Sequence, residues 1–450
     1  MTQSDFPTTV QPEAAPAAPG ATRSDQIALA FLLACGLLAA PLLFAARLPQ
    51  SVLIVAIAAL LAVFIARGLL TRSLLPHTAV DWPNILLLLA LPAGLWASTD
   101  TAVSWPVIAK TVAGFAIFYG VAGLAGTHWT RLLPWLVLAA SAGLALVVLL
   151  GTNWTTAKLP FLPDALYQAL PRLPLPWRPE GIHPNLAGGA MAWLLLPAVA
   201  LAAWSRNRRM QGLAGVAAVL LALALLLSQS RGAWLGAAAG LLAMPALRYR
   251  RGWIAPAMAL VVGAVVALAL GPGQIMQAIL PPSVAEEVTI NTLPGRLELW
   301  TRALAMLHDF GVAGAGPGQF EQLVMVLYPP FFTGLLGGFQ HAHNLFLQMA
   351  VDFGMPGLIA LIALLLGMGA SIVAATRRWP GQTSASLPLA ALAVGVFGSL
   401  LALAVHGMVD APHVAPRGYA LIFALFGVAA ALSGQLLATP AAGETAEPPG

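Results

Sequence analysis

Apolar segments of about 20 residues recur along almost the whole chain, and they constrain the fold more than any other feature. A helix needs about 20 residues to cross the hydrocarbon layer of a bilayer. The 450-residue chain is 59% hydrophobic and only 8% charged, whereas soluble globular proteins contain roughly 25% charged residues. We therefore expect an all-α polytopic membrane protein.

These segments predict about twelve transmembrane helices in a single domain over residues 26–437. The expected spans are 27–46, 51–70, 83–98, 106–126, 131–150, 185–204, 211–228, 232–247, 253–271, 343–375, 387–407 and 415–437. The span 343–375 should bend at its Gly-Met-Pro-Gly sequence, because such a combination kinks a helix. The polar and proline-rich ends, 1–25 and 438–450, are expected to be disordered cytoplasmic and C-terminal tails.

Short basic loops predict the orientation of the chain in the membrane. The loops SRNRRMQG (205–212), RYRRGW (248–253) and TRRWPG (376–381) are typical of the cytoplasmic side. With twelve spans, both termini are then cytoplasmic. Two long loops, 151–184 and 272–342, lie on the outer side, and the second should carry short amphipathic helices because it contains GRLELWTRALAMLHDF.

Five pieces of chain bring polar side chains to this outer side, and together they predict a site there. The candidate residues are His183, Asn185, Arg231, Arg296, His341, His343, Asn344 and Asp410. Each also has a purely structural interpretation. An arginine at a helix end can extend its charged head to the interface, which would account for Arg231, and Arg296 could pair with Glu298 or Glu287.

The other candidates have similar alternatives. His341 and His343 could be ordinary interfacial residues. Asn185 could be the cap of a helix, and Asp410 could form a buried ion pair with Arg417.

A polar stripe is predicted beside the histidines. If residues 341–353 are helical, then His341, Asn344, Gln348 and Asp352 share one face. Irregular backbone at membrane depth is tolerated only where it is buried in protein or lines a cavity. The stripe is therefore interpreted as the wall of an internal cavity.

Known cofactor motifs do not account for this set of residues. The chain has one cysteine and no HExxH sequence, and the glycine-rich GAGPGQF (314–320) lacks the Gly-Lys-Ser/Thr ending of a phosphate-binding loop. We predict neither a metal nor a cofactor. An outward-facing site cannot use cytoplasmic nucleotides, so a synthetic reaction there needs a membrane-soluble donor such as a polyprenyl diphosphate sugar. Arginines suit a diphosphate leaving group, and a neutral histidine suits a general base.

The motifs SRGAWLG, GRLELWTRAL, GVAGAGPGQF, HAHNLFLQMAVDFGMPGL and HGMVD, in this order, resemble the O-antigen ligase and polymerase superfamily. The resemblance covers roughly residues 175–430. It implies a bacterial inner-membrane glycosyltransferase of the GT-C type that uses glycans linked to undecaprenyl diphosphate, inverts the anomeric carbon and needs no metal. It also implies roles for individual residues: Arg231 and Arg296 hold the diphosphate, His343 or His341 is the base, and Asp410 is supportive.

The resemblance leaves the acceptor open. Ligation of O-antigen to lipid A–core is favoured over polymerisation of the same donor, and a transporter, for example of inorganic carbon, is the alternative from another class. Transporters usually contain internal repeats and a site at mid-depth, and no repeat is evident here. Lys110, within the span 106–126, is left without an interpretation.

Overall fold

The computed structural model describes most of the chain. The described residues are 22–154, 181–279, 293–331, 339–377, 387–413 and 418–438, together with positions 165, 167, 170, 173 and 174. The predicted tails lie outside this part, except for their innermost residues. There the prediction was wrong at the N-terminus, because Thr22 and Asp25 form a capping box that starts the first helix at Arg23.

The described residues form fourteen α-helices and two short 3-10 helices, which confirms the all-α class. They are α1 (Arg23–Leu43), η1 (Ala45–Arg47), α2 (Gln50–Thr71), α3 (Asp81–Ala97), α4 (Thr101–Ala122), η2 (His128–Leu132), α5 (Leu133–Gly151), α7 (Pro184–Trp204), α8 (Arg208–Leu227), α9 (Arg231–Arg248), α10 (Ile254–Ile279), α11 (Leu293–Phe310), α12 (Phe320–Leu327), α13 (Leu345–Thr376), α14 (Leu387–Gly407) and α15 (Gly418–Ala438).

Each of the twelve predicted spans coincides with one of these helices. Within the described part, nine segments are long and apolar enough to cross a membrane, and the protein is polytopic. The other three predicted spans are α3, α9 and α10. Helix α3 has only 17 residues, and in α10 the part described without interruption, Ile254–Val266, is shorter than a membrane span. The total of twelve therefore stays a prediction.

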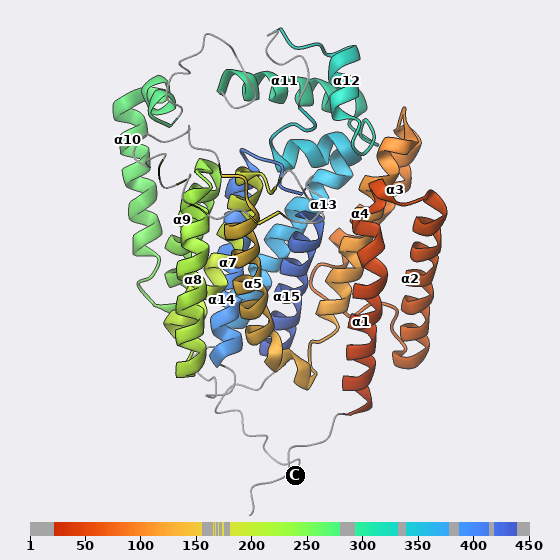
Figure 1. Ribbon diagram of the computed structural model, residues 1–450, viewed down its shortest axis with the longest axis vertical. Coiled ribbons are helices and arrows are strands. Elements are labelled where there is room, and N and C mark those ends of the chain that lie inside the picture. Colours follow the sequence, from red (N-terminus) through yellow and green to blue (C-terminus); the bar gives the residue numbers. More distant parts are fainter. Residues whose placement is uncertain are drawn as a thin grey trace, which may run out of the picture.

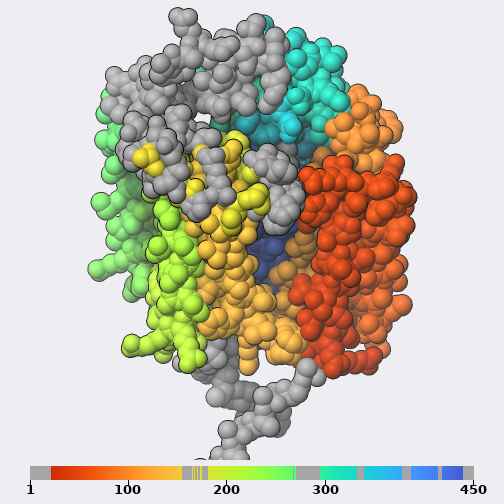
Figure 2. Space-filling model, in the orientation of Figure 1, coloured from red at the N-terminus to blue at the C-terminus, as the bar shows by residue number. Residues whose placement is uncertain are grey.

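The long helices run side by side, and α11 lies across one end of the bundle with α12 beside it (Figure 1). Helix α14 packs against α7 and α9, α15 against α4, and α13 against α3. The amphipathic helices predicted for the second long loop are thus present as α11 and α12. Figure 2 shows a hollow between α1 and α5, at whose base the deep blue of α15 is visible.

Helix α13 is bent where the sequence predicted. Gly354 has φ 67° and ψ −167° inside the helix, a combination that essentially only glycine adopts. The condition on which the polar stripe was predicted, a helix that already includes His341, is not met. The Asn344 side chain accepts hydrogen bonds from the amides of Phe346 and Leu347, both at 3.0 Å, so the helix begins at Leu345.

The glycine-rich segment 311–320 is bonded to this bend. The Met355 amide donates to the Gly311 carbonyl at 2.7 Å and the Ala315 amide to the Val351 carbonyl at 2.7 Å. On its far side, Gln319 donates to the hydroxyls of Ser98 and Ser104 and to the Asp100 carbonyl. The segment therefore connects α13 to the turn between α3 and α4.

The predicted polar stripe belongs to the same connection. Asp352 accepts from the Gly318 amide at 3.0 Å and from the Gln348 side chain at 2.9 Å. Gln348 in turn accepts from the amide of Ala342 at 2.8 Å. Because Asp352 and Gln348 are buried and bonded to protein, the stripe is a support for the histidine segment rather than the wall of a cavity.

Gly354→Ala is expected to lower the free energy of unfolding by at least about 1–3 kcal/mol, the cost of a strained backbone conformation. An added methyl group would also lie 2.5 Å from the Val312 carbonyl oxygen. Gly143→Ala on α5 is the matched control, because a methyl group there meets no atom within 4 Å and alanine favours a helix. Thermal unfolding of both variants in detergent is the measurement, and equal unfolding temperatures would contradict the prediction.

Candidate active site

Three elements meet at the end of the bundle that α11 covers. The histidine segment precedes α13, Asp410 follows α14, and Arg231 is the first residue of α9. Gly232 of α9 packs directly on the ring of His406 and on Val409. Because α7, α9 and α13 all begin at this end, the basic turns that follow their C-terminal ends, with Arg209, Arg251 and Arg377, lie at the opposite end of the bundle.

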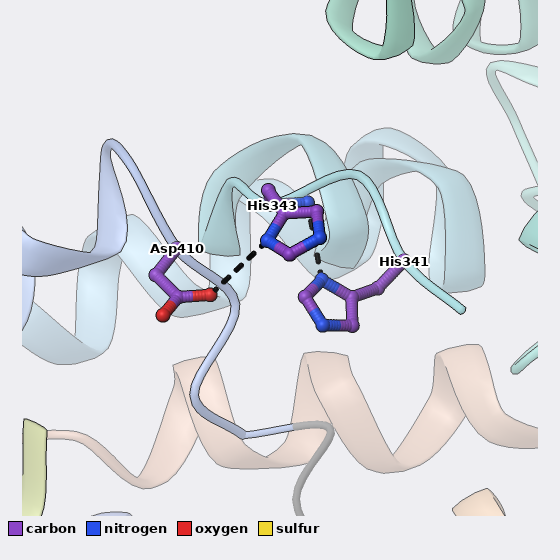
Figure 3. Close-up of side chains that lie close together, drawn as sticks. All are labelled: His341, His343 and Asp410. Carbon is purple, nitrogen blue, oxygen red and sulfur yellow. Dashed lines mark hydrogen bonds and ion pairs between the residues drawn. The ribbon is translucent and has the colours of Figure 1, made fainter. Parts of the chain in front are cut away.

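His343 faces the carboxylate of Asp410 (Figure 3). The His343 Nδ1 and Asp410 Oδ1 atoms are 3.5 Å apart. The other carboxylate oxygen is 3.6 Å from His406 Nε2. Asp410 thus lies between two imidazoles, within ion-pair distance of both.

His341 lies against His343, with ring centroids 4.1 Å apart. The His343 backbone amide donates to His341 Nδ1 at 3.1 Å. Burial, with the nearby charges of His343 and Arg296, lowers the pKa of His341 to about 4 although Asp410 opposes the shift. The ring is therefore neutral at pH 7, and because Nδ1 accepts a hydrogen bond, its proton is on Nε2.

The two histidines differ in what they can do chemically. His341 has its lone pair on Nδ1, which already faces the amide of His343. If His343 directs an Nδ1 proton toward Asp410, its Nε2 atom carries a lone pair that can accept another proton. The geometry therefore favours His343 over His341 as a base.

His343 has an unusual backbone conformation, with φ 48°, and so does Gln229 in the turn before Arg231, with φ 50°. Positive φ is uncommon for residues other than glycine, and strained residues of this kind gather at functional sites. In His343 it is maintained by the hydrogen bonds on both sides, to His341 and through Ala342 to Gln348.

The electrostatic surroundings of Asp410 keep it charged. Burial raises its pKa, but the interactions with His343 and His406 outweigh burial and hold the pKa of Asp410 well below its usual range. A carboxylate that stays ionised can stabilise a positive charge that develops on His343.

The arginines lie beside this group. Arg296, on α11, donates a hydrogen bond to the Val409 carbonyl, next to Asp410. Burial lowers the pKa of Arg296; the Asp410 carboxylate opposes this shift, and the charge of Arg231 adds to it. Both guanidinium groups are half-buried. The predicted pairing partner Glu298 is 2.5 Å from Arg302 instead, and Glu287 lies outside the described residues.

The remaining candidates have structural contacts. Asn344 caps α13 and its amide donates to the Met408 carbonyl at 2.9 Å, so it joins the two loops of the site. The expectation that Asn185 caps a helix was wrong: His183 is the cap of α7 and accepts from the Asn185 amide at 3.3 Å. Arg417, the alternative partner of Asp410, lies outside the described residues.

Two histidines were not predicted to be part of the site. His406, 1% exposed, approaches Asp410, and His413, 3% exposed, lies on the loop between α14 and α15. The spacing His406–Asp410 was a usable signal, because residues four apart face each other wherever the helical turn continues.

Three side chains of the site are also close enough together to bind a metal ion. His341, His343 and Asp410 each offer one ligand atom, and these atoms lie within 4.8 Å of one another. The donor set of two imidazoles and a carboxylate suits zinc or another transition metal. Against this, His341 Nδ1 already accepts from a backbone amide, which leaves only the protonated nitrogen of that ring.

Comparison with known proteins identifies the central part of the chain. Residues 216–362 match the O-antigen ligase family model. The predicted resemblance is confirmed over these residues, which include both arginines and both histidines of the site. No curated protein matches the chain. The O-antigen ligase domain indicates a membrane glycosyltransferase that acts on lipid-linked glycans, and Asp410, His183 and Asn185 lie outside the matched range.

Proposed function

We propose that the protein transfers a glycan from undecaprenyl diphosphate to an acceptor hydroxyl, and that the acceptor is lipid A–core. The observation that carries this proposal is the position of His343, which lies between Asp410 and His341, two residues that both interact electrostatically with Arg296. A base beside a cationic group is what a reaction with an alcohol nucleophile and a diphosphate leaving group requires.

In the proposed step, the acceptor oxygen forms a bond to the anomeric carbon while the bond from that carbon to the diphosphate oxygen breaks. His343 Nε2 takes the proton of the acceptor hydroxyl. The diphosphate leaves with the bonding electron pair. Asp410 stabilises the imidazolium, and Arg231 and Arg296 stabilise the charge of the leaving group. No metal or other cofactor takes part.

The site is proposed to face the periplasm from the bacterial inner membrane, with both termini in the cytoplasm. This orientation is supported by the separation of the site from the basic turns at the opposite end of the bundle. Polymerisation, in which a second lipid-linked glycan is the acceptor, would use the same donor site.

The test uses purified protein in lipid bilayers with a synthetic polyprenyl-diphosphate glycan. Lipid A–core and a second donor molecule are offered separately as acceptors, with and without EDTA. We expect release of polyprenyl diphosphate with lipid A–core and no effect of EDTA. Turnover only with the second donor would establish a polymerase, and loss of turnover in EDTA would establish a metal site at His341, His343 and Asp410.

If the wild-type protein turned over no donor with any acceptor, the glycosyltransferase proposal would be wrong. A transport assay with inorganic carbon in liposomes would then follow, since a transporter is the alternative from another class.

The pH dependence of turnover should show a neutral His341. Because its pKa is lowered to about 4, its ring stays neutral above about pH 5 and becomes protonated only below about pH 4. Protonation would break the bond from the His343 amide and add a positive charge beside the base. Because His343 must itself be neutral to act as the base, both proteins lose turnover toward acid pH. We expect this acidic limb to steepen near pH 4 in the wild type, where His341 adds a second proton, and not in His341→Asn, whose side-chain oxygen can still accept from that amide. A pH profile identical in both proteins would contradict this.

A further inference from the structure

His406 is the penultimate residue of α14 and is only 1% exposed. Its Nε2 atom lies 3.6 Å from Asp410 Oδ2, whereas the other carboxylate oxygen, Oδ1, faces His343. The carboxylate is thus contacted on one oxygen by the proposed base and on the other by a buried imidazole to which the transfer step assigns no part.

Two glycines pack directly on the His406 ring and fix where it lies. On α7, a methyl group at Gly189 would lie 2.7 Å from Cε1 and 3.0 Å from Nδ1 of the ring. On α9, a methyl group at Gly232 would lie 3.2 Å from Cδ2. Because carbon atoms pack at about 3.5–4.0 Å, a side chain at either position would press on the ring. Nε2, the ring atom between Cε1 and Cδ2, faces the Asp410 carboxylate.

The two ring nitrogens of His406 have different surroundings. Nδ1 is buried and has no hydrogen-bond partner among the residues that the structure describes, whereas Nε2 faces Asp410. A buried N–H group without an acceptor costs free energy, so the ring proton belongs on Nε2. His406 therefore presents a donor to the carboxylate.

The backbone of His406 anchors Asp410 as well. The amides of Val409 and Asp410 both donate to the His406 carbonyl, each at 3.0 Å. The Ala411 amide donates at 2.8 Å to Asp410 Oδ1, the oxygen that faces His343. Each carboxylate oxygen thus has its own neighbours, and rotation of the carboxylate would break the contacts on both sides. Without the His406 ring, nothing on the Oδ2 side described here would oppose that rotation.

We propose that His406 is a positioning residue, which holds the Asp410 carboxylate in the orientation that directs the Nδ1 proton of His343 and leaves Nε2 of His343 to act as the base. The proposal rests on the proposed glycosyl transfer. The hydrogen bond at one nitrogen of a histidine sets the state of the other, so the orientation of the carboxylate affects the reacting atoms.

The first test compares His406→Leu and His406→Gln with wild type in lipid bilayers, using the synthetic donor and whichever acceptor the wild type consumes. Leucine fills similar space without a donor, whereas glutamine places an N–H donor near the position of imidazole Nε2. A misplacement of about 1 Å can lower a rate by about 10²-fold, so His406→Leu should lower kcat by about 10- to 100-fold.

The affinity of His406→Leu for the donor lipid should stay within about twofold of wild type, and His406→Gln should recover most of kcat. Equal losses of kcat in the two variants would overturn the proposal, because the donor on Nε2 would then be irrelevant.

A double-mutant cycle shows whether His406 acts through Asp410. In Asp410→Ala neither carboxylate oxygen remains, so the addition of His406→Leu should lower kcat by less than about twofold more. Losses that multiply would overturn the proposal, since His406 would then act independently of the carboxylate.

Gly189→Ala displaces the imidazole without removing it, because the added methyl group would lie 2.7 Å from the ring. We expect kcat to fall, although alanine favours a helix. Gly215→Ala on α8 is the matched control, because a methyl group there meets no atom within 4 Å. Thermal unfolding of all variants identifies any that fail to fold. The same kcat in Gly189→Ala and in the control would contradict the proposal.

Nuclear magnetic resonance keeps the two proposals distinguishable if no turnover is seen. In protein with 15N-labelled histidine, the imidazole shifts report which nitrogen carries the proton, and His343→Asn identifies the signals of His343. These signals should change in His406→Leu and stay as in wild type in His406→Gln and Gly215→Ala. Identical His343 signals in His406→Leu and wild type would overturn the positioning role, whether or not the protein transfers a glycan.

Discussion

His343→Asn is expected to lower kcat by about 10²- to 10⁴-fold, the usual contribution of a general base, while the affinity for the donor lipid stays within about twofold of wild type. Asparagine places an amide where Nδ1 of the imidazole lies, so it can still face Asp410, 3.5 Å away in the wild type. It has no nitrogen that accepts a proton. Single-turnover rates together with equilibrium binding of the donor lipid separate the two effects.

His341→Asn is the control for this experiment. The substitution keeps an acceptor for the His343 amide, which donates to His341 Nδ1 at 3.1 Å, and should therefore cost far less activity at neutral pH. If His341→Asn were inactive and His343→Asn active, the base would be His341. Asp410→Asn should also be strongly impaired, because it removes the charge that stabilises the imidazolium while leaving an atom of similar size.

Arg296→Met is expected to lower kcat by about 10²- to 10³-fold, which is typical for the loss of one donor to a charged transition state. The substitution removes a half-buried guanidinium group and its bond to the Val409 carbonyl. Arg296→Lys should recover part of the activity, because lysine keeps the charge but not the planar pair of donors.

Arg302→Met is the matched control on the same helix. Arg302 pairs with Glu298 at 2.5 Å and stacks on Phe331 at 4.5 Å from the ring centroid, away from Asp410. It should keep wild-type turnover even if α11 becomes less stable. Equal losses in the two variants would mean that Arg296 acts through the position of α11 and not on the leaving group.

The sequence predicted the architecture well for a physical reason. Apolar runs of membrane length leave the chain no alternative to helices, because backbone groups in lipid must bond internally, and every predicted span is a helix. Helix α3 has only 17 residues, so its hydropathy and length do not decide whether it crosses the membrane. The bend at Gly354 was predictable, because its residues allow few other conformations.

The details of the site were less predictable, because they depend on contacts between distant segments. No local sequence signal shows that Gln348 accepts a hydrogen bond from the Ala342 amide. Nor does one show that the helix begins only after Asn344 and therefore excludes His341. The grouping of polar residues by membrane side brought His343, Asp410 and the arginines to one end, but it could not show which nitrogen of each histidine is occupied.

The order in which the chain is synthesised determines when the contact between His343 and Asp410 can form. Both arginines and both histidines precede α14 in the chain, and Asp410 follows it. During membrane insertion, His343 therefore exists without its carboxylate until the hairpin of α14 and α15 has docked. A chain that ends before α14 would contain both arginines, His341 and His343, yet not Asp410. Under the proposed mechanism, glycosyl transfer therefore requires the last hairpin to be complete.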